Sequence, residues 1–190
     1  MISTFTALLD ADVLYKVRLT SLLLFLAEQK MFRARWSDDI HEEWMRSLKV
    51  NRPDLSEQGI ETRRDRMNAA IPDALVEGYR SISIPGMPDP DDAHVVAAAV
   101  LTRATMIVTF NLKDFPDEVL RPLRLEARHP DDFLVDQFTL EPTLFAQAVR
   151  TDRGHYRNPP MISADYLNAL ERAGVPKIVA RLRDIAVLLD

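Results

Sequence analysis

Four segments with acidic or amide side chains constrain the fold of this chain most strongly. Asp10 closes a short apolar run at 7–9, and Asn111 follows another at 105–109. Glu43 and Asp92 lie near the starts of segments with a helical pattern. Short apolar runs bounded by polar residues are typical of buried parallel strands. Because ligands of such sheets bind at the carboxyl ends of the strands, we expect these side chains to converge on that edge.

Strand and helix patterns alternate up to about residue 135. We predict strands at 5–9, 81–84, 105–109 and 123–127, and helices at 14–29, 37–53, 56–67, 72–78 and 89–103. Ser37 can cap one of these helices, and Asp89 can cap another with Pro90 in its first position. The alternation predicts an α/β fold with a short parallel central sheet flanked by helices.

Only helical patterns follow His129-Pro130. They cover about 131–138, 142–150, 163–173 and 176–188, with Asn158-Pro159-Pro160 as a linker. We therefore divide the chain into an α/β domain over residues 1–135 and a C-terminal helical extension over residues 136–190.

The composition suits a globular protein of one medium domain with an appendage, since 47% of the 190 residues are hydrophobic and 28% are charged. Cysteine is absent, which excludes disulfides and thiolate metal sites and fits a reducing cytoplasm. The first four residues lack the basic region of a signal peptide, and the apolar stretch at 22–27 is too short for a bilayer. We expect a cytoplasmic protein without a membrane partner.

Carboxylates gathered at one sheet edge would repel one another unless a divalent cation lay between them. Oxygen ligands of this kind suit Mg²⁺ or Mn²⁺ better than zinc. Two such ions can activate a water, orient a phosphate and stabilise the leaving oxygen. The net charge of −5 argues only weakly against a nucleic-acid substrate, because bound cations would neutralise such a cluster. The residues thus point to metal-assisted phosphate chemistry.

The order of these segments resembles that of PIN-domain ribonucleases, of the kind found as VapC-type toxins of bacterial toxin–antitoxin pairs. The resembling stretch runs from Leu8 to about Phe115. Its motifs are Leu9-Asp10-Ala11-Asp12-Val13-Leu14, Ser37 with Glu43, Asp92 with the Ala-rich 93–99, and Thr109-Phe110-Asn111-Leu112-Lys113-Asp114-Phe115. Many members carry Asp at the position of Asn111, but one branch combines Asn there with an Asp three residues later. The helical tail also resembles the C-terminal extension of that branch.

The resemblance implies a Rossmann-like PIN fold and an Mg²⁺- or Mn²⁺-dependent endoribonuclease that leaves a 5′-phosphate and a 3′-hydroxyl. It also implies an RNA substrate, an antitoxin protein as partner in a type II toxin–antitoxin system, and homodimerisation. Carried over residue by residue, Asp10, Glu43, Asp92 and Asp114 would bind metal, and Asn111 would ligate it or orient water. These five are the candidate catalytic residues, and the metals rather than a histidine would generate the nucleophile.

Two alternative functions are compatible with the same residues. A PIN-like regulator could hold RNA or a partner without cleaving it, and Asn111 favours that reading. A haloacid-dehalogenase-like phosphatase would use Asp10 and Asp12 as nucleophile and acid–base, but no later strand ends in the paired acids that it needs.

The other polar residues near these motifs have simpler interpretations. Asp12 is interpreted as a support or cap, Glu42 competes with Glu43 for one role, and His41 is expected to face solvent. Asp89 and Asp91 are interpreted as a helix cap and a charge set against the helix dipole.

Overall fold

Five short parallel strands form the centre of the structure, a computed structural model that describes residues 5–186 and 189. Their order is β3-β2-β1-β4-β5. The strands are β1 (Thr6–Leu9), β2 (Arg33–Ser37), β3 (Leu75–Val76), β4 (Met106–Val108) and β5 (Glu126–Arg128). The predicted parallel sheet is thus confirmed. The expectation about a signal peptide concerns residues 1–4, which lie outside the described residues.

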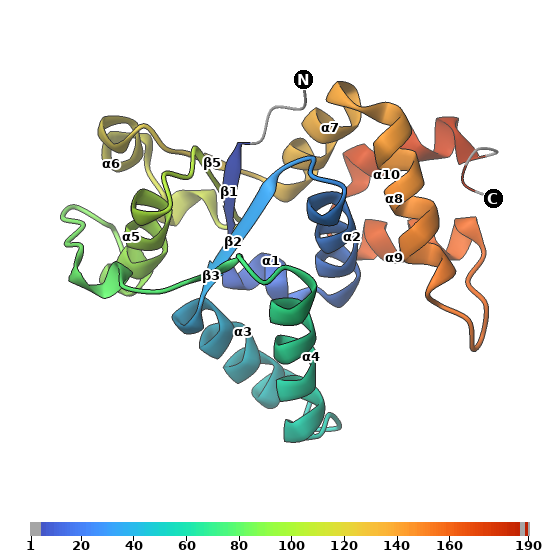
Figure 1. Cartoon of the computed structure of the whole chain (residues 1–190), viewed down its shortest axis with the longest axis horizontal. Helices are drawn as coiled ribbons and strands as arrows, with labels where there is room; N and C mark the ends of the chain where they lie inside the picture. Colours follow the sequence, from blue (N-terminus) through green and yellow to red (C-terminus); the bar gives the residue numbers. More distant parts are fainter. Residues whose placement is uncertain (1–4, 187–188, 190) are drawn as a thin grey trace.

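Helices cover both faces of this sheet, with α5 on one side and α2 on the other (Figure 1). In the first part of the chain they are α1 (Ala11–Tyr15), α2 (Val17–Glu28), α3 (Asp38–Asn51), α4 (Glu57–Ala70), α5 (Ala93–Leu101) and α6 (Asp117–Leu120). Four 3₁₀ turns connect them: η1 (Tyr79–Ser81), η2 (Pro90–Asp92), η3 (Leu112–Asp114) and η4 (Arg121–Leu123). Across the described part of the chain, each helix is too short or too polar to cross a membrane.

Strand register brings two functional segments to one edge of the sheet. In the parallel pair of β1 and β4, Leu9 lies opposite Val108. The backbone N–H of Asp10 then donates to the carbonyl of Val108 at 3.0 Å. The residues that follow β1 and β4 therefore leave the sheet side by side, which places Asp10 next to the segment that begins at Thr109.

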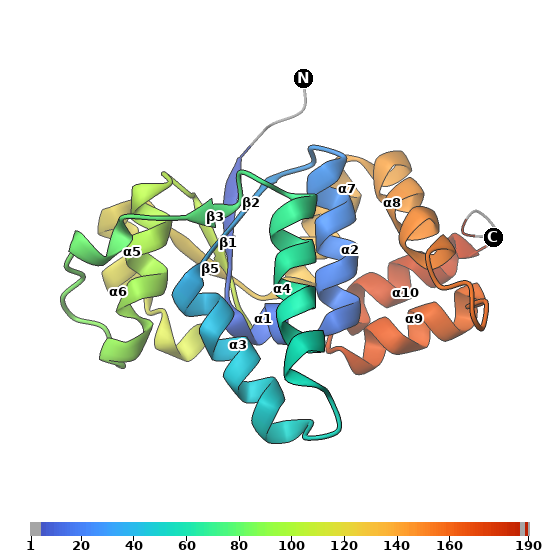
Figure 2. The same ribbon diagram turned by 60° about the horizontal axis from the view of Figure 1, so that its bottom comes forward.

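The C-terminal part is helical, as predicted. It contains α7 (Pro130–Leu140), α8 (Pro142–Gly154), α9 (Ser163–Arg172) and α10 (Pro176–Asp184), which lie together at one end of the molecule (Figures 1 and 2). Helix α8 packs on α2, and the buried Asp131 carboxylate accepts the backbone N–H groups of Lys177 and Ile178 at the start of α10. The domain boundary after residue 135 stays a prediction and falls within α7. The last predicted helix extended to Leu188, which lies outside the described residues.

Some predicted elements differ from the structure for identifiable reasons. The helix expected at 14–29 is interrupted at Lys16, whose backbone is extended, and the Arg63 side chain donates to the carbonyl of Leu14 at that break. Strand β2 was not predicted because Arg33 and Arg35 lie within it, although the buried Ala34 and Trp36 alternate with them.

The region between α4 and α5 was predicted wrongly. The helix expected at 72–78 is instead β3, whose residue Leu75 pairs with Trp36 of β2. The strand expected at 81–84 is the end of η1 followed by loop. β3 forms one edge of the sheet with only two residues, which is too few for a strand pattern in the sequence. Their extended conformation is stabilised by pairing with β2.

Ser37 caps α3, as predicted, and its replacement by alanine should destabilise the protein measurably. Ser37 is fully buried, and its hydroxyl accepts the backbone N–H of Ile40 at 3.2 Å. Ser56 caps α4 in the same way through Gly59 at 3.1 Å, but it is exposed. We expect Ser37→Ala to cost about 1–2 kcal/mol and Ser56→Ala less, because water can replace the lost cap only at the exposed site. Urea denaturation of the two variants measures the difference, and an equal loss would contradict the expectation.

Candidate active site

A cavity of about 550 Å³ opens at the carboxyl end of β1. Its acidic and amide lining residues are Asp10, Asp12, Glu43, Asn51, Asp92 and Asn111. They come from the end of β1, from α1, from α3, from η2 and from the loop after β4. The structure thus brings four of the five predicted site residues into one cavity. Asp114 does not line it; its carboxylate accepts a hydrogen bond from the Asn111 side-chain amide.

Asp10 is held by hydrogen bonds on both of its oxygens. Oδ1 accepts the backbone N–H of Ala11 at 2.7 Å, which makes Asp10 the cap of α1. Oδ2 lies 2.8 Å from the hydroxyl of Thr109, which is fully buried. The same hydroxyl lies 3.2 Å from Asp12 Oδ2 and accepts the backbone N–H of Asn111 at 3.0 Å. Thr109 therefore ties the first acidic segment to the last.

Asp12 supports this junction. Its Oδ2 accepts the backbone N–H of Phe110 at 3.0 Å, while its buried Oδ1 has no hydrogen-bond partner. Because Asp12 connects α1 to the loop after β4, it helps to set the position of Asn111.

Burial and mutual repulsion make the acids of the cavity hard to ionise together. Burial, followed by the charges of Asp12 and Glu43, raises the pKa of Asp10 to about 7. Burial also raises the pKa of Asp92, to about 6, and the charges of Asp10 and Asp114 add to this effect. Raised pKa values of neighbouring carboxyl groups indicate a site that a cation would stabilise.

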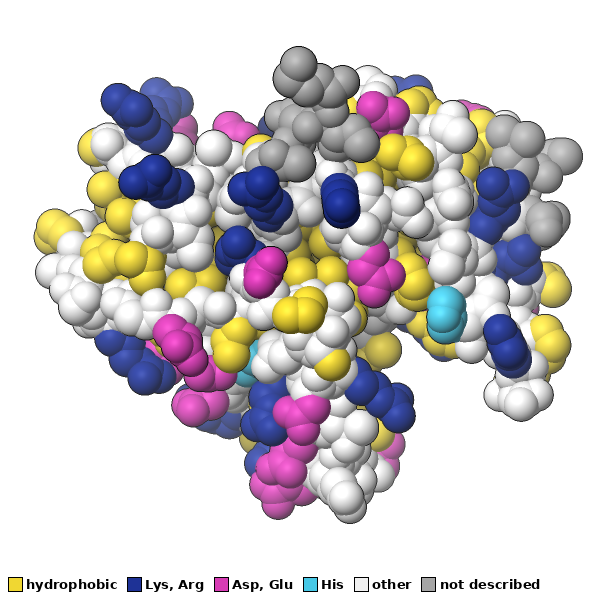
Figure 3. All heavy atoms as spheres, viewed as in Figure 1, with side chains coloured by type: hydrophobic (Ala, Val, Ile, Leu, Met, Phe, Trp, Pro, Cys, Tyr) yellow, Lys and Arg dark blue, Asp and Glu magenta, His cyan; other side chains and the backbone are white. Residues whose placement is uncertain are grey.

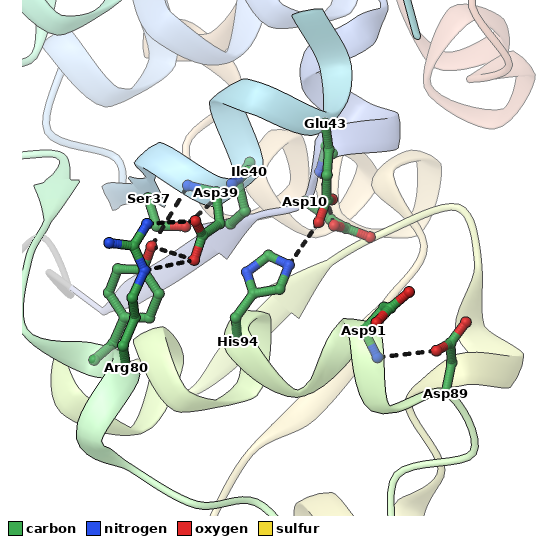
Figure 4. A network of polar contacts seen from close by, with 11 residues as sticks. Asp10, Ser37, Asp39, Ile40, Glu43, Arg80, Asp89, Asp91 and His94 are labelled. Atoms are coloured by element: carbon green, nitrogen blue, oxygen red, sulfur yellow. Dashed lines mark hydrogen bonds and ion pairs between the residues drawn. The ribbon is translucent and has the colours of Figure 1, made fainter. Parts of the chain in front are cut away.

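Glu43 points from α3 into the space between Asp10 and α5 (Figure 4). Its Oε1 lies 2.6 Å from Nε2 of His94, the second residue of α5. Burial lowers the pKa of His94, but the hydrogen bond to Glu43 and the charges of Glu43, Asp39 and Asp10 together outweigh burial, so that this pKa is raised overall. The competing residue Glu42 lines a different cavity, together with Arg46 and Arg80.

Asp89 and Asp91 lie away from Glu43 in the same view (Figure 4). Asp89 Oδ1 accepts the backbone N–H of Asp91 at 2.9 Å, so Asp89 is the cap that the sequence predicts. Asp91 is exposed in the first turn.

The donor set of the cavity fits a hard divalent cation in its chemistry. Carboxylate and amide oxygens are what Mg²⁺ and Mn²⁺ prefer, and Asp12 Oδ1 is a buried oxygen without a partner. In the described part of the chain, no three His, Asp or Glu side chains stand close enough to hold one ion as they are.

Two cationic residues, Lys16 and Arg46, also line the cavity. Lys16 belongs to a basic set around the first helix that could hold an RNA backbone, although a solvated helix face is the simpler interpretation of that set, and Arg46 was not predicted. Arg46 lies one helical turn after Glu43, and that spacing could have indicated a shared face. Lys16 stands at the break between α1 and α2, with its Nζ 4.9 Å from the centre of the Phe110 ring. The projection formed by α3 and α4 carries both signs of charge side by side (Figure 3), with ion pairs such as Lys49–Glu57. Any contact with a polyanion would thus depend on local cations.

The expectation that His41 faces solvent is wrong, because only 1% of its surface is exposed. Its Nδ1 accepts from Trp44 Nε1 at 2.9 Å, and its Nε2 lies 3.0 Å from Asn68 Oδ1. The same amide oxygen accepts from Trp36 Nε1 at 2.7 Å. This buried network joins β2, α3 and α4, and so fixes the helix that carries Glu43.

The fold and the cavity define a parallel α/β protein with acids gathered at the carboxyl edge of its sheet. A family model described as PIN domain matches residues 6–113, more than half of the chain. The chain therefore belongs to the PIN domain family, and the predicted Rossmann-like PIN fold with a helical extension is confirmed. This assignment argues against the haloacid-dehalogenase-like alternative.

The C-terminal helices also match a family model, described as VapC50 C-terminal domain, over residues 130–184. The chain is similar to the "Putative ribonuclease VapC50" of Mycobacterium tuberculosis (strain ATCC 25618 / H37Rv), with 44% identity over 92 residues. This alignment covers 48% of the chain and 54% of the relative, so the chain spans about half the length of the curated relative that it matches. No solved structure matches the chain.

Proposed function

We propose that the protein is an endoribonuclease that hydrolyses RNA phosphodiester bonds with the help of Mg²⁺ or Mn²⁺. The observation that carries the proposal is the cavity in which Asp10, Glu43 and Asp92 converge from three separate segments. Membership of the PIN domain family and the similarity to the M. tuberculosis protein named as a putative ribonuclease support the same activity.

The residues of the cavity suggest a division of roles. Asp10, Glu43 and Asp92 would hold the metal directly, with Asp114 as a further ligand that its bond to Asn111 brings toward the site. The bound metal would supply an activated water and would stabilise charge on the phosphate. The Asn111 amide is suited to orient that water, and Lys16 and Arg46 are suited to contact phosphates of the RNA.

The proposal includes the biological setting. The chain would be the toxin of a type II toxin–antitoxin system, cytoplasmic, inhibited by a cognate antitoxin protein and able to form a homodimer. The match of its C-terminal helices to the VapC50 C-terminal domain model supports this setting. Residues 1–135 would form the nuclease domain and residues 136–190 the extension.

Metal removal tests the activity. The purified protein should cleave RNA when Mg²⁺ or Mn²⁺ is added, and EDTA should abolish cleavage by at least about a hundredfold, because the acids cannot activate water alone. Mapping of the product ends should give 5′-phosphates and 3′-hydroxyls. Cleavage that persists in EDTA, or ends that carry 2′,3′-cyclic phosphates, would overturn the proposal.

A second candidate is a PIN protein that binds RNA or a partner without cleaving it. The hydrogen bond between Asn111 and Asp114 favours it, since it engages two of the five proposed catalytic residues with each other. RNA binding that shows no cleavage with any divalent metal would support this candidate.

A further inference from the structure

A hydrogen bond bridges the two helices that flank the acidic cavity. His94 of α5 contacts Glu43 of α3 through Nε2 and Oε1 at 2.6 Å (Figure 4). The His94 side chain is 17% exposed and that of Glu43, which lines the cavity, is 36% exposed, so this contact is partly shielded from water. His94 therefore contacts one proposed metal ligand, Glu43, and follows another, Asp92, by two residues in the sequence.

Both ends of the bridge are anchored. The helix α5 buries Val95 and the residues up to Ala99 against β1, β2 and β4. The first turn of α3 is held by Asp39, whose carboxylate accepts from the Tyr79 hydroxyl at 2.7 Å and from the Arg80 guanidinium. Because Tyr79 and Arg80 belong to η1, which packs on α5, the two helices keep a set spacing. The His94–Glu43 bond therefore acts between rigid supports.

The His94 ring makes its hydrogen bond through one of its two nitrogens. Its Nδ1 is buried and has no hydrogen-bond partner, so Nε2 alone carries the directed contact. Glu43, by contrast, has a long side chain with three rotatable bonds, and fixing such a side chain costs conformational entropy. The bond engages Oε1 and thereby limits the directions in which Oε2 can point.

We propose that His94 is a positioning residue that holds the Glu43 carboxylate toward the cavity, ready to bind a divalent cation. This inference rests on the proposed function, since it concerns the same metal site. The physical reason is preorganisation: groups that orient a ligating side chain typically change metal affinity by about 10- to 100-fold when they are removed. His94 takes no part in the reaction itself.

Replacement of His94 by glutamine or by asparagine distinguishes a role in orienting Glu43 from a role in packing alone. A glutamine side-chain amide can reach the position of imidazole Nε2, whereas that of asparagine reaches only the position of Nδ1. His94→Gln should therefore keep the contact with Glu43, and His94→Asn should lose it. Titration of the protein with Mn²⁺ alone, followed by calorimetry, should give a Kd raised about 10- to 100-fold in His94→Asn and within about threefold of the wild type in His94→Gln. In RNA cleavage, His94→Asn should need more Mn²⁺ for half-maximal rate, and saturating Mn²⁺ should restore most of kcat.

A double-mutant cycle shows whether His94 acts through Glu43. In a Glu43→Gln background, the further change His94→Asn should alter the Mn²⁺ Kd by less than about twofold, since the group that it positions is already lost. Circular dichroism and thermal melting of each metal-free variant establish that it is folded; should His94→Asn not fold, His94→Ala takes its place. Equal Mn²⁺ affinity of the wild type and the Asn or Ala variant would overturn the inference and leave the proposed function intact. A wild-type protein that binds no Mn²⁺ would instead refute the proposed function, and the inference with it.

Discussion

Asp10→Asn should make the metal-free protein more stable at pH 8 and at the same time abolish RNA cleavage. Asp10 is only 7% exposed, and its pKa of about 7 in the folded state lies well above the ordinary 3.8. Above pH 7 the fold must therefore hold a charge that the unfolded chain carries more easily. Asparagine removes that charge and can keep the bond from the Ala11 N–H, while its amide can donate to the Thr109 hydroxyl.

The sign of the pH dependence follows from the raised pKa. Well below the ordinary pKa of 3.8, Asp10 is protonated in both states, and its ionisation has no effect on stability. As the pH rises from that value to the folded-state pKa of about 7, the unfolded chain ionises first and the wild type loses stability relative to the variant, by on the order of 2–4 kcal/mol at pH 8. Cleavage should fall by at least about 10³-fold, since a lost metal ligand removes several kcal/mol of stabilisation of charge in the transition state.

Urea denaturation in EDTA between pH 4 and 8 measures the stability difference, and RNA cleavage with Mn²⁺ measures activity. Addition of Mn²⁺ should then stabilise the wild type and not the variant. Asp89→Asn is the matched control, because Asp89 is an exposed cap outside the cavity and asparagine caps equally well. A variant that is destabilised at pH 8, or one that cleaves RNA like the wild type, would contradict the assignment of Asp10.

Asp152→Ala should lower the free energy of unfolding by about 2–5 kcal/mol, because it leaves two polar groups without their acceptor in a buried environment. Asp152 of α8 is fully buried. Its Oδ1 accepts from the Ser21 hydroxyl of α2 at 2.5 Å, and its Oδ2 accepts from the Tyr166 hydroxyl of α9 at 2.6 Å. Burial raises the pKa of Asp152, and the hydrogen bonds from Ser21 and Tyr166 oppose that rise. One carboxylate thus joins the helical extension to a helix of the α/β part.

Urea denaturation with two comparison variants tests this role. Tyr166→Phe removes one of the two bonds and should cost about 1–2 kcal/mol. Asp136→Ala removes a carboxylate of α7 that pairs with Arg128 but is 44% exposed, and it should cost less than about 1 kcal/mol. A loss in Asp152→Ala no larger than that in Asp136→Ala would show that the buried carboxylate does not hold the extension in place.

Much of the fold follows from local patterns. The apolar runs before Asp10 and Asn111 predict β1 and β4, and the segments after Ser37 and Asp89 predict α3 and the start of α5. These predictions hold because the signals act over a few residues: caps satisfy free N–H groups, and short apolar runs need burial. β2 and β3 were missed because pairing with neighbouring strands outweighs the charged pattern of β2 and the short, sparse pattern of β3.

The candidate site was predictable as a set of residues but not as an arrangement. The sequence indicates Asp10, Glu43 and Asp92, since their spacing from strand ends and helix starts matches a known family pattern. The roles of Thr109 and His94 depend on contacts between segments distant in the chain, 99 residues apart for Thr109 and Asp10 and 51 for His94 and Glu43. No local pattern encodes such distances.

The sequence by itself therefore determined the α/β class, the acids at the strand ends and the helical nature of the C-terminal part. Only the tertiary structure decided that Asp114 bonds to Asn111 without itself lining the cavity, that His41 is buried, and that His94 contacts Glu43. The physical reason is that strands and caps form from neighbouring residues, whereas burial and side-chain pairing depend on how the sheet brings remote segments together.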